Sequence, residues 1–149
     1  MKKRDDDFFG ESFSAGPEPM RFEVQEDGHV FGWNAPSSAE YDNVLRVFVN
    51  GNELVPTIHN HKTEVWEKID FGLFKAGDDV EFSIDVLNTG EVFSSNYKEN
   101  FDGIGHLHSA NYGQNDMLYL GFEDLGYEGI PGDLDYNDAV FHFQNVSIL

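Results

Sequence analysis

The chain has 149 residues, a length that fits one domain with a single hydrophobic core. Its 28 acidic and 9 basic side chains leave a formal net charge of -19, which argues against a surface for nucleic acid or for an anionic membrane. It has no cysteine, so disulfides and thiolate metal sites are excluded, and oxygen ligands favour hard cations such as calcium.

The first 20 residues predict a flexible or loosely docked N-terminal arm. They mix charged residues with Gly, Ser and Pro, and they contain Phe8, Phe9 and Phe13, which favour some docking. No apolar run follows the basic residues at the start, so they do not form a secretory signal peptide. No later run reaches the ~20 apolar residues that a membrane span needs, and residues 21–149 are expected to form one domain.

From residue 21 onward, short segments alternate apolar with polar residues, a period of two that predicts half-buried strands. The clearest signal is a hairpin of residues 44–49 and 53–55, because Asn50 and Gly51 accept the positive φ angles of a tight primed turn. Further strands are expected at 21–25, 29–33, 65–71, 82–86, 91–95, 117–122 and 139–148.

This pattern predicts an all-β domain, a single sandwich or jelly roll. Two polar segments, 96–115 and 124–138, are too long for tight turns and are expected to be loops. Long loops on a rigid sandwich are the usual place for binding sites.

The segment 121–138 carries the strongest functional signal. Asp133, Asp135 and Asn137 stand at every second position, with Asp138 beside them, so their oxygen atoms can curl around one cation. Calcium takes six to eight oxygen ligands at ~2.3–2.6 Å in irregular geometry, whereas magnesium demands a stricter octahedron. The segment therefore predicts a calcium-binding loop.

Glu123 and Asp124 end the preceding strand and would complete the calcium shell if that strand and the last one are neighbours. Residues 114–149 contain no Lys or Arg, so these acidic groups repel one another unless a cation is bound. The loop is not an EF-hand, because Asp138 stands where that loop needs Gly. Two alternatives to a calcium site stay open: simple turn formation by Asp, Asn and Gly, and an acidic surface for solubility or high salt.

Two motifs of this segment, Gly-Phe-Glu-Asp-Leu at 121–125 and Asp-Leu-Asp-Tyr-Asn-Asp at 133–138, precede a last apolar strand. They resemble the signature of a bacterial domain of unknown function that occurs in secreted, surface-anchored and adhesin-like proteins. The polar motifs at 93–96, 100–103 and 106–108 are similar to the segment that precedes this signature. The resemblance implies a β-rich, calcium-associated envelope or matrix module without agreed catalytic activity, although the signal peptide and anchoring tail of typical members are missing here.

Weaker candidates for contact with a polysaccharide or peptide ligand lie in the two polar segments. Histidines in a glycine-rich stretch and tyrosines beside acidic groups can contact a ligand or the calcium shell. Trp33 and Trp66 could stack on sugar rings, but the core is the expectation for this pair, because aromatic residues of a sandwich are usually buried. The other candidates are Asn100, Asp102, His106, His108, Tyr112 and Tyr127.

The sequence contains no clear match to a known catalytic motif. His59 and His61, followed by Glu64, could belong to a cupin metal site, but the spacing fits poorly and an exposed strand end is favoured. No carboxylate pair is singled out for glycoside hydrolysis, and the sequence has no nucleophile elbow or phosphate-binding glycine loop. We therefore expect a protein that is not an enzyme.

The preferred hypothesis is a calcium-binding, extracellular recognition module of a bacterial surface or secreted protein, with the export route open. A structural matrix or envelope domain that calcium merely rigidifies is the alternative. A cupin-like metal-dependent enzyme is a distant third.

Overall fold

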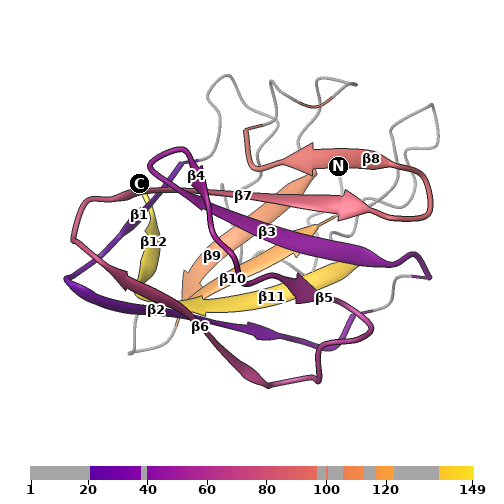
Figure 1. The fold of residues 1–149 in the computed structure, drawn as a ribbon, viewed down its shortest axis with the longest axis horizontal. Coiled ribbons are helices and arrows are strands. Elements are labelled where there is room, and N and C mark those ends of the chain that lie inside the picture. The colour runs from indigo at the N-terminus through magenta and orange to yellow at the C-terminus, as the bar shows by residue number, and fades with distance from the viewer. Residues whose placement is uncertain (1–20, 38–39, 97–99, 101–105, 113–116, 123–137) are drawn as a thin grey trace, which may run out of the picture.

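The computed structural model describes residues 21–37, 40–96, 100, 106–112, 117–122 and 138–149. These residues form two antiparallel β-sheets that lie face to face (Figure 1), so the predicted all-β sandwich is confirmed. The described part of the chain contains no helix long and apolar enough to cross a membrane. The predicted N-terminal arm, residues 1–20, lies outside the described residues.

The first sheet, sheet A, has seven strands in the order β12-β1-β7-β3-β4, with β5 also paired to β3 and β8 to β7. The predicted tight turn joins β3 to β4, where Asn50 has φ 51° and Gly51 has φ 84°. The strands are β1 (Phe22–Val24), β3 (Asn43–Val49), β4 (Asn52–Glu53), β5 (Ile58–His59), β7 (Asp79–Val86), β8 (Glu91–Ser94) and β12 (Val146–Ile148).

The second sheet, sheet B, has five strands in the order β6-β2-β11-β10-β9. Strands β9, β10 and β11 follow one another in an up-and-down meander, and the early strand β2 lies beside β11. The bounds are β2 (Gly28–Asn34), β6 (Lys68–Phe74), β9 (Leu107–Tyr112), β10 (Met117–Phe122) and β11 (Ala139–Gln144).

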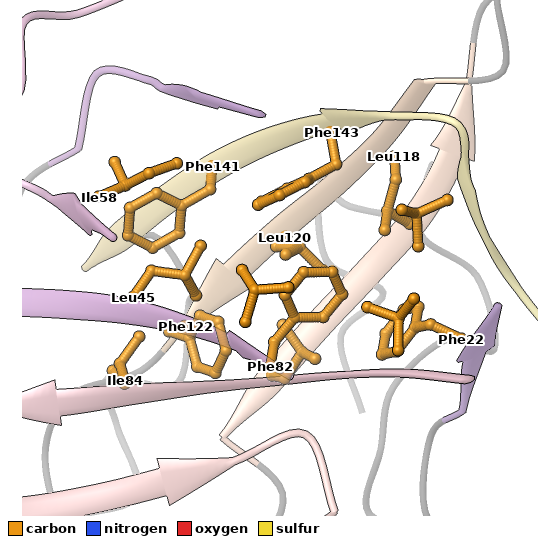
Figure 2. Packing of buried hydrophobic residues seen from close by; sticks show 14 of the residues in the cluster. Phe22, Leu45, Ile58, Phe82, Ile84, Leu118, Leu120, Phe122, Phe141 and Phe143 are labelled. Atoms are coloured by element: carbon orange, nitrogen blue, oxygen red, sulfur yellow. The ribbon is translucent and has the colours of Figure 1, made fainter. Parts of the chain in front are cut away.

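The core between the sheets is built largely from phenylalanine. Figure 2 shows Phe82 of β7 and Phe143 of β11 pointing toward each other across the sandwich, with ring centroids 5.0 Å apart. Phe22 contacts Phe82 edge to face, at 5.1 Å, and Phe71 lies 5.4 Å from Phe143. A Cβ atom on Gly32 would lie only 2.8–2.9 Å from the rings of Phe143 and Phe71, so the missing side chain of Gly32 lets these rings pack against β2.

Several predicted strands differ in extent from the observed ones, and for two of them the backbone shows the reason. The single strand expected at 139–148 is divided at Asn145, whose φ of 74° turns the chain out of sheet B and into sheet A. The strand expected at 65–71 begins only at Lys68, because Trp66 has φ 68°, outside the extended region.

The expectation of a loop throughout 96–115 is wrong over Leu107–Tyr112, which forms β9. Residues 107–110 are all buried, so they show no alternation of apolar and polar side chains. His108, Ser109 and Asn111 interrupt the apolar residues of this stretch, so it lacks a clear strand pattern, and its pairing with all six residues of β10 makes it a strand.

Candidate functional site

The strands on either side of the predicted calcium loop are neighbours in sheet B. Phe122 at the end of β10 pairs with Ala139 at the start of β11, and the Asp138 backbone N–H donates to the Phe122 carbonyl at 3.0 Å. The chain therefore leaves β10 and enters β11 at adjacent points. This adjacency is the condition under which Glu123 and Asp124 are expected to join the calcium shell.

Asp138 is half-buried at this edge of the sheet. Within the described ranges, no group of three or more His, Asp or Glu side chains is arranged to hold a metal ion. The remaining predicted ligands Glu123, Asp124, Asp133, Asp135 and Asn137, together with the contact candidates Asp102 and Tyr127, lie outside the described residues.

Three of the weaker contact candidates are interior residues. His108 lies in β9 and not in a loop, with 2% of its surface exposed, and His106 is 1% exposed with its ring stacked 3.8 Å from that of Phe93. Asn100 is buried, and its Oδ1 accepts a hydrogen bond from the Ser94 backbone N–H at 2.7 Å. All three side chains are buried, and their contact with a ligand stays a prediction.

Tyr112, the fourth described candidate, belongs to a group of aromatic rings on the outer face of sheet B. The register places Trp33, His142 and Tyr119 side by side across β2, β11 and β10, on the side away from the core. We call this group the aromatic face; it consists of Phe31, Trp33, Trp66, Tyr112, Tyr119 and His142.

His142 is the centre of the aromatic face. The ring centroids of Trp66, Tyr112 and Tyr119 lie 5.2, 5.4 and 5.6 Å from its own, each in an edge-to-face arrangement. The Tyr112 hydroxyl forms a hydrogen bond with His142 Nδ1. Burial lowers the pKa of His142 and raises that of Tyr112, so both groups are neutral at neutral pH.

The expectation that Trp33 and Trp66 belong to the core is wrong. Trp66 is 55% exposed, and Trp33 is half-buried on the outward side of β2. The larger apolar residues of β2, Phe31 and Trp33, share one set of alternating positions, and the other set contains Val30, Gly32 and Asn34. Alternation alone therefore favours burial of Phe31 and Trp33, and no signal in the sequence places them on the outer face.

The backbone around Trp66 holds its ring in place against local preference. Its N–H donates to the Asn34 carbonyl at 2.8 Å, and Val65 forms an isolated parallel bridge with Asn34. The buried Asn34 side chain donates from Nδ2 to the carbonyls of Asn60 at 3.1 Å and Thr63 at 2.7 Å. A bulky residue with positive φ costs of order 1 kcal/mol or more and persists only when its surroundings fix it.

Some of the charged groups at the border of the aromatic face have defined partners. The Lys68 ammonium lies 4.0 Å from the centre of the Phe31 ring, and the His29 ring stacks on Phe31 at 5.6 Å. His29 Nδ1 is 3.0 Å from Asp70 Oδ1, a hydrogen bond that lowers the pKa of Asp70. The centre of the face thus offers neutral rings, and its border carries charged groups, which include the exposed Glu64 and Glu67 close to Trp66.

Comparison of the sequence with protein-family models and with curated proteins finds no match. The functional argument therefore depends on the residues themselves.

The outer face of sheet A has different chemistry. Arg46 donates from Nε to Asp85 at 2.6 Å and from Nη1 to Glu53 at 2.8 Å. A shallow recess of ≈ 270 Å³ lies beside this ion pair, lined by Phe48, Glu81, Ser83, Val92 and Ser94. Ion pairs and small polar groups dominate this surface, in contrast to the aromatic face.

The geometry around His59 disfavours a metal site there. His59 Nδ1 accepts hydrogen bonds from the backbone N–H groups of His61 at 3.0 Å and Lys62 at 3.1 Å. The proton of the neutral ring therefore lies on Nε2, which faces Asp42 Oδ1 at 3.8 Å and has no lone pair to give a metal. Asp42 is in turn bonded to His61 Nδ1 at 2.9 Å, which lowers its pKa.

This arrangement predicts the titration of His59. Burial lowers the pKa of the His59 ring below its ordinary value of 6.5. Below about pH 6.5, His59 therefore binds a proton more readily in the unfolded chain than in the folded protein. Its contribution should lower the free energy of unfolding as the pH falls through this range. NMR should find the Nε2–H tautomer, a depressed pKa, and no change in the His59 resonances on addition of zinc; a proton on Nδ1 would contradict the assignment.

Proposed function

We propose that this protein is a calcium-binding recognition module of a bacterial surface or secreted protein, without catalytic activity. The pairing of β10 with β11 supports it most directly, because Phe122 and Asp138 lie at one edge of the sheet and are joined by a hydrogen bond. In this proposal, the acidic segment between them closes around calcium.

The calcium ligands would be the carboxylates and the amide of this segment: Asp133, Asp135, Asn137, Asp138, Glu123 and Asp124. A formal net charge of -19 strains the folded state by self-repulsion, and a divalent cation relieves it where the charges are densest. A weak dissociation constant, ~10⁻⁴ to 10⁻³ M, is enough for an extracellular module. The resemblance of 121–125 and 133–138 to the surface-associated family supports the same location.

The recognition half of the proposal is supported by the aromatic face. Trp66 is 55% exposed and the other rings of the face are half-buried, and a contiguous, partly exposed apolar surface commonly marks a binding site. This favours a recognition module over the structural matrix alternative.

Thermal unfolding with calcium and with chelator tests the calcium part. At a calcium concentration about 100 times the dissociation constant, binding should stabilise the fold by ~2.7 kcal/mol and raise the Tm accordingly. The double substitution Asp133→Asn and Asp135→Asn should remove most of this calcium-dependent shift.

The matched control neutralises two exposed carboxylates elsewhere, Glu26→Gln and Glu40→Gln, and should keep the calcium shift. An equal shift from sodium at the same ionic strength, or a full shift in the Asp133 and Asp135 variant, would exclude the loop as a calcium site.

A further inference from the structure

We propose that the aromatic face of sheet B binds a neutral polysaccharide, whose sugar rings stack on Trp66 and on the row formed by Trp33, His142 and Tyr119. This inference names the ligand class of the recognition function proposed above and rests on that function. It does not depend on the calcium loop, because each of these rings lies in a described strand or is held by one.

The shape of the face suits an extended chain. Trp33, His142 and Tyr119 occupy paired positions on three adjacent strands, so the outer two are separated by two strand spacings, about 10 Å. Trp66 adds a fourth ring next to His142, 5.2 Å away. Rings that recur on three adjacent strands of an open sheet surface offer a linear polymer several points of contact, whereas a small molecule needs an enclosing cavity.

The chemistry of the rings suits sugars. A pyranose presents C–H groups on its faces and hydroxyl groups around its edge, so it needs an apolar surface bordered by hydrogen-bonding groups. Trp and Tyr provide both, since each ring carries an N–H or O–H at its periphery. The neutral His142 and Tyr112, hydrogen-bonded to each other, keep ionic charge out of the centre of the face.

The charge of the protein selects against other ligands. A net charge of -19 repels anionic polysaccharides and nucleic acids. A basic peptide would be attracted by the overall field, so the experiment includes a Lys-rich peptide as the competing ligand. The uncharged rings at the centre of the face favour a neutral ligand.

Tryptophan fluorescence reports on this face directly. The chain has two Trp residues, Trp33 and Trp66, and both belong to the aromatic face. Titration with soluble neutral polysaccharides (β-glucan, xylan, mannan and galactan), in calcium buffer, should shift the emission with at least one of them. Affinity electrophoresis in gels containing the same polymers should show retarded migration.

Trp66→Ala should weaken binding about tenfold or more, since a stacked ring is lost, and Trp66→Phe should restore part of it. Trp66 is exposed, so its replacement leaves the core intact. Tyr119→Ala is a second variant from a different strand and should weaken binding in the same way. Phe48→Ala removes an aromatic ring from the outer face of the other sheet and should leave binding unchanged.

The results separate this inference from the calcium proposal. If no neutral polysaccharide binds while calcium still raises the Tm, the ligand class is wrong and the calcium site stands. If Trp66→Ala and Tyr119→Ala both bind the polysaccharide as tightly as the unsubstituted protein, the aromatic face is not the binding site. Binding only to pectate or heparin, or only to a Lys-rich peptide, would also overturn it.

Discussion

Replacing Phe82 by Ala should destabilise the protein by about 3–5 kcal/mol, the cost of truncating a large core side chain and leaving a cavity. Phe82 is fully buried and contacts Phe22 of its own sheet at 5.1 Å and Phe143 of the opposite sheet at 5.0 Å. Because it joins the two layers of the sandwich (Figure 2), the surrounding rings cannot easily collapse into the space. Urea unfolding followed by far-UV circular dichroism measures the loss.

Phe48→Ala serves as the control, because Phe48 lies one strand away on the outer face of the same sheet. Phe48→Ala should lower the free energy of unfolding much less than Phe82→Ala does. Comparable losses for the two variants would mean that the space between the sheets is not the principal core.

Replacing Asn34 should lower the stability of the fold and also change the environment of Trp66 on the aromatic face. Asn34→Ala removes the donor to the Asn60 and Thr63 carbonyls and should cost about 1–3 kcal/mol, because those buried acceptors lose their partner. Asn34→Asp should cost more, since a carboxylate would then face two carbonyl oxygens in the interior. Both variants should also shift the Trp emission to longer wavelength, because the segment that carries Trp66 is released.

Asn88→Ala is the matched control for this prediction. Asn88 is exposed, and its side chain accepts a hydrogen bond from the Asp42 backbone N–H at 2.7 Å, so its replacement also removes one side-chain contact to the backbone. It should leave the Trp emission unchanged and cost less than Asn34→Ala. An unchanged emission in both Asn34 variants would show that Trp66 is held by other contacts.

These two predictions connect the core with the proposed ligand surface. The core-facing side of β2 carries Gly32 and Asn34, and its outward side carries Trp33. Gly32 admits the rings of Phe71 and Phe143, and Asn34 ties down the chain around Trp66. The position of the exposed rings therefore depends on the packing beneath them.

Local patterns in the sequence were enough to establish the class of the fold. The alternation of 82–86 predicts a strand because side chains on a strand point to opposite faces, and this stretch lies in β7. Asn50 and Gly51 predict their turn because few residues adopt positive φ angles. The charge of -19 and the spacing of Asp133, Asp135 and Asn137 are likewise properties of the sequence, and they suggested the calcium proposal that the pairing of β10 with β11 supports.

Only the tertiary structure decided which residues meet. Strand β9 escaped sequence-based prediction because it is buried without alternation, so His106 and His108 proved to be interior residues. The core placement predicted for Trp33 failed because hydrophobicity alone does not tell which side of a strand faces inward; register does, and it is set by the pairing of β2 with β11. Trp66 lies outside the strands, where its φ of 68° and its hydrogen bond to Asn34 fix its position. The neighbourhood of Phe122 and Asp138 likewise follows from the pairing of β10 with β11, two strands that residues 123–137 separate in the sequence.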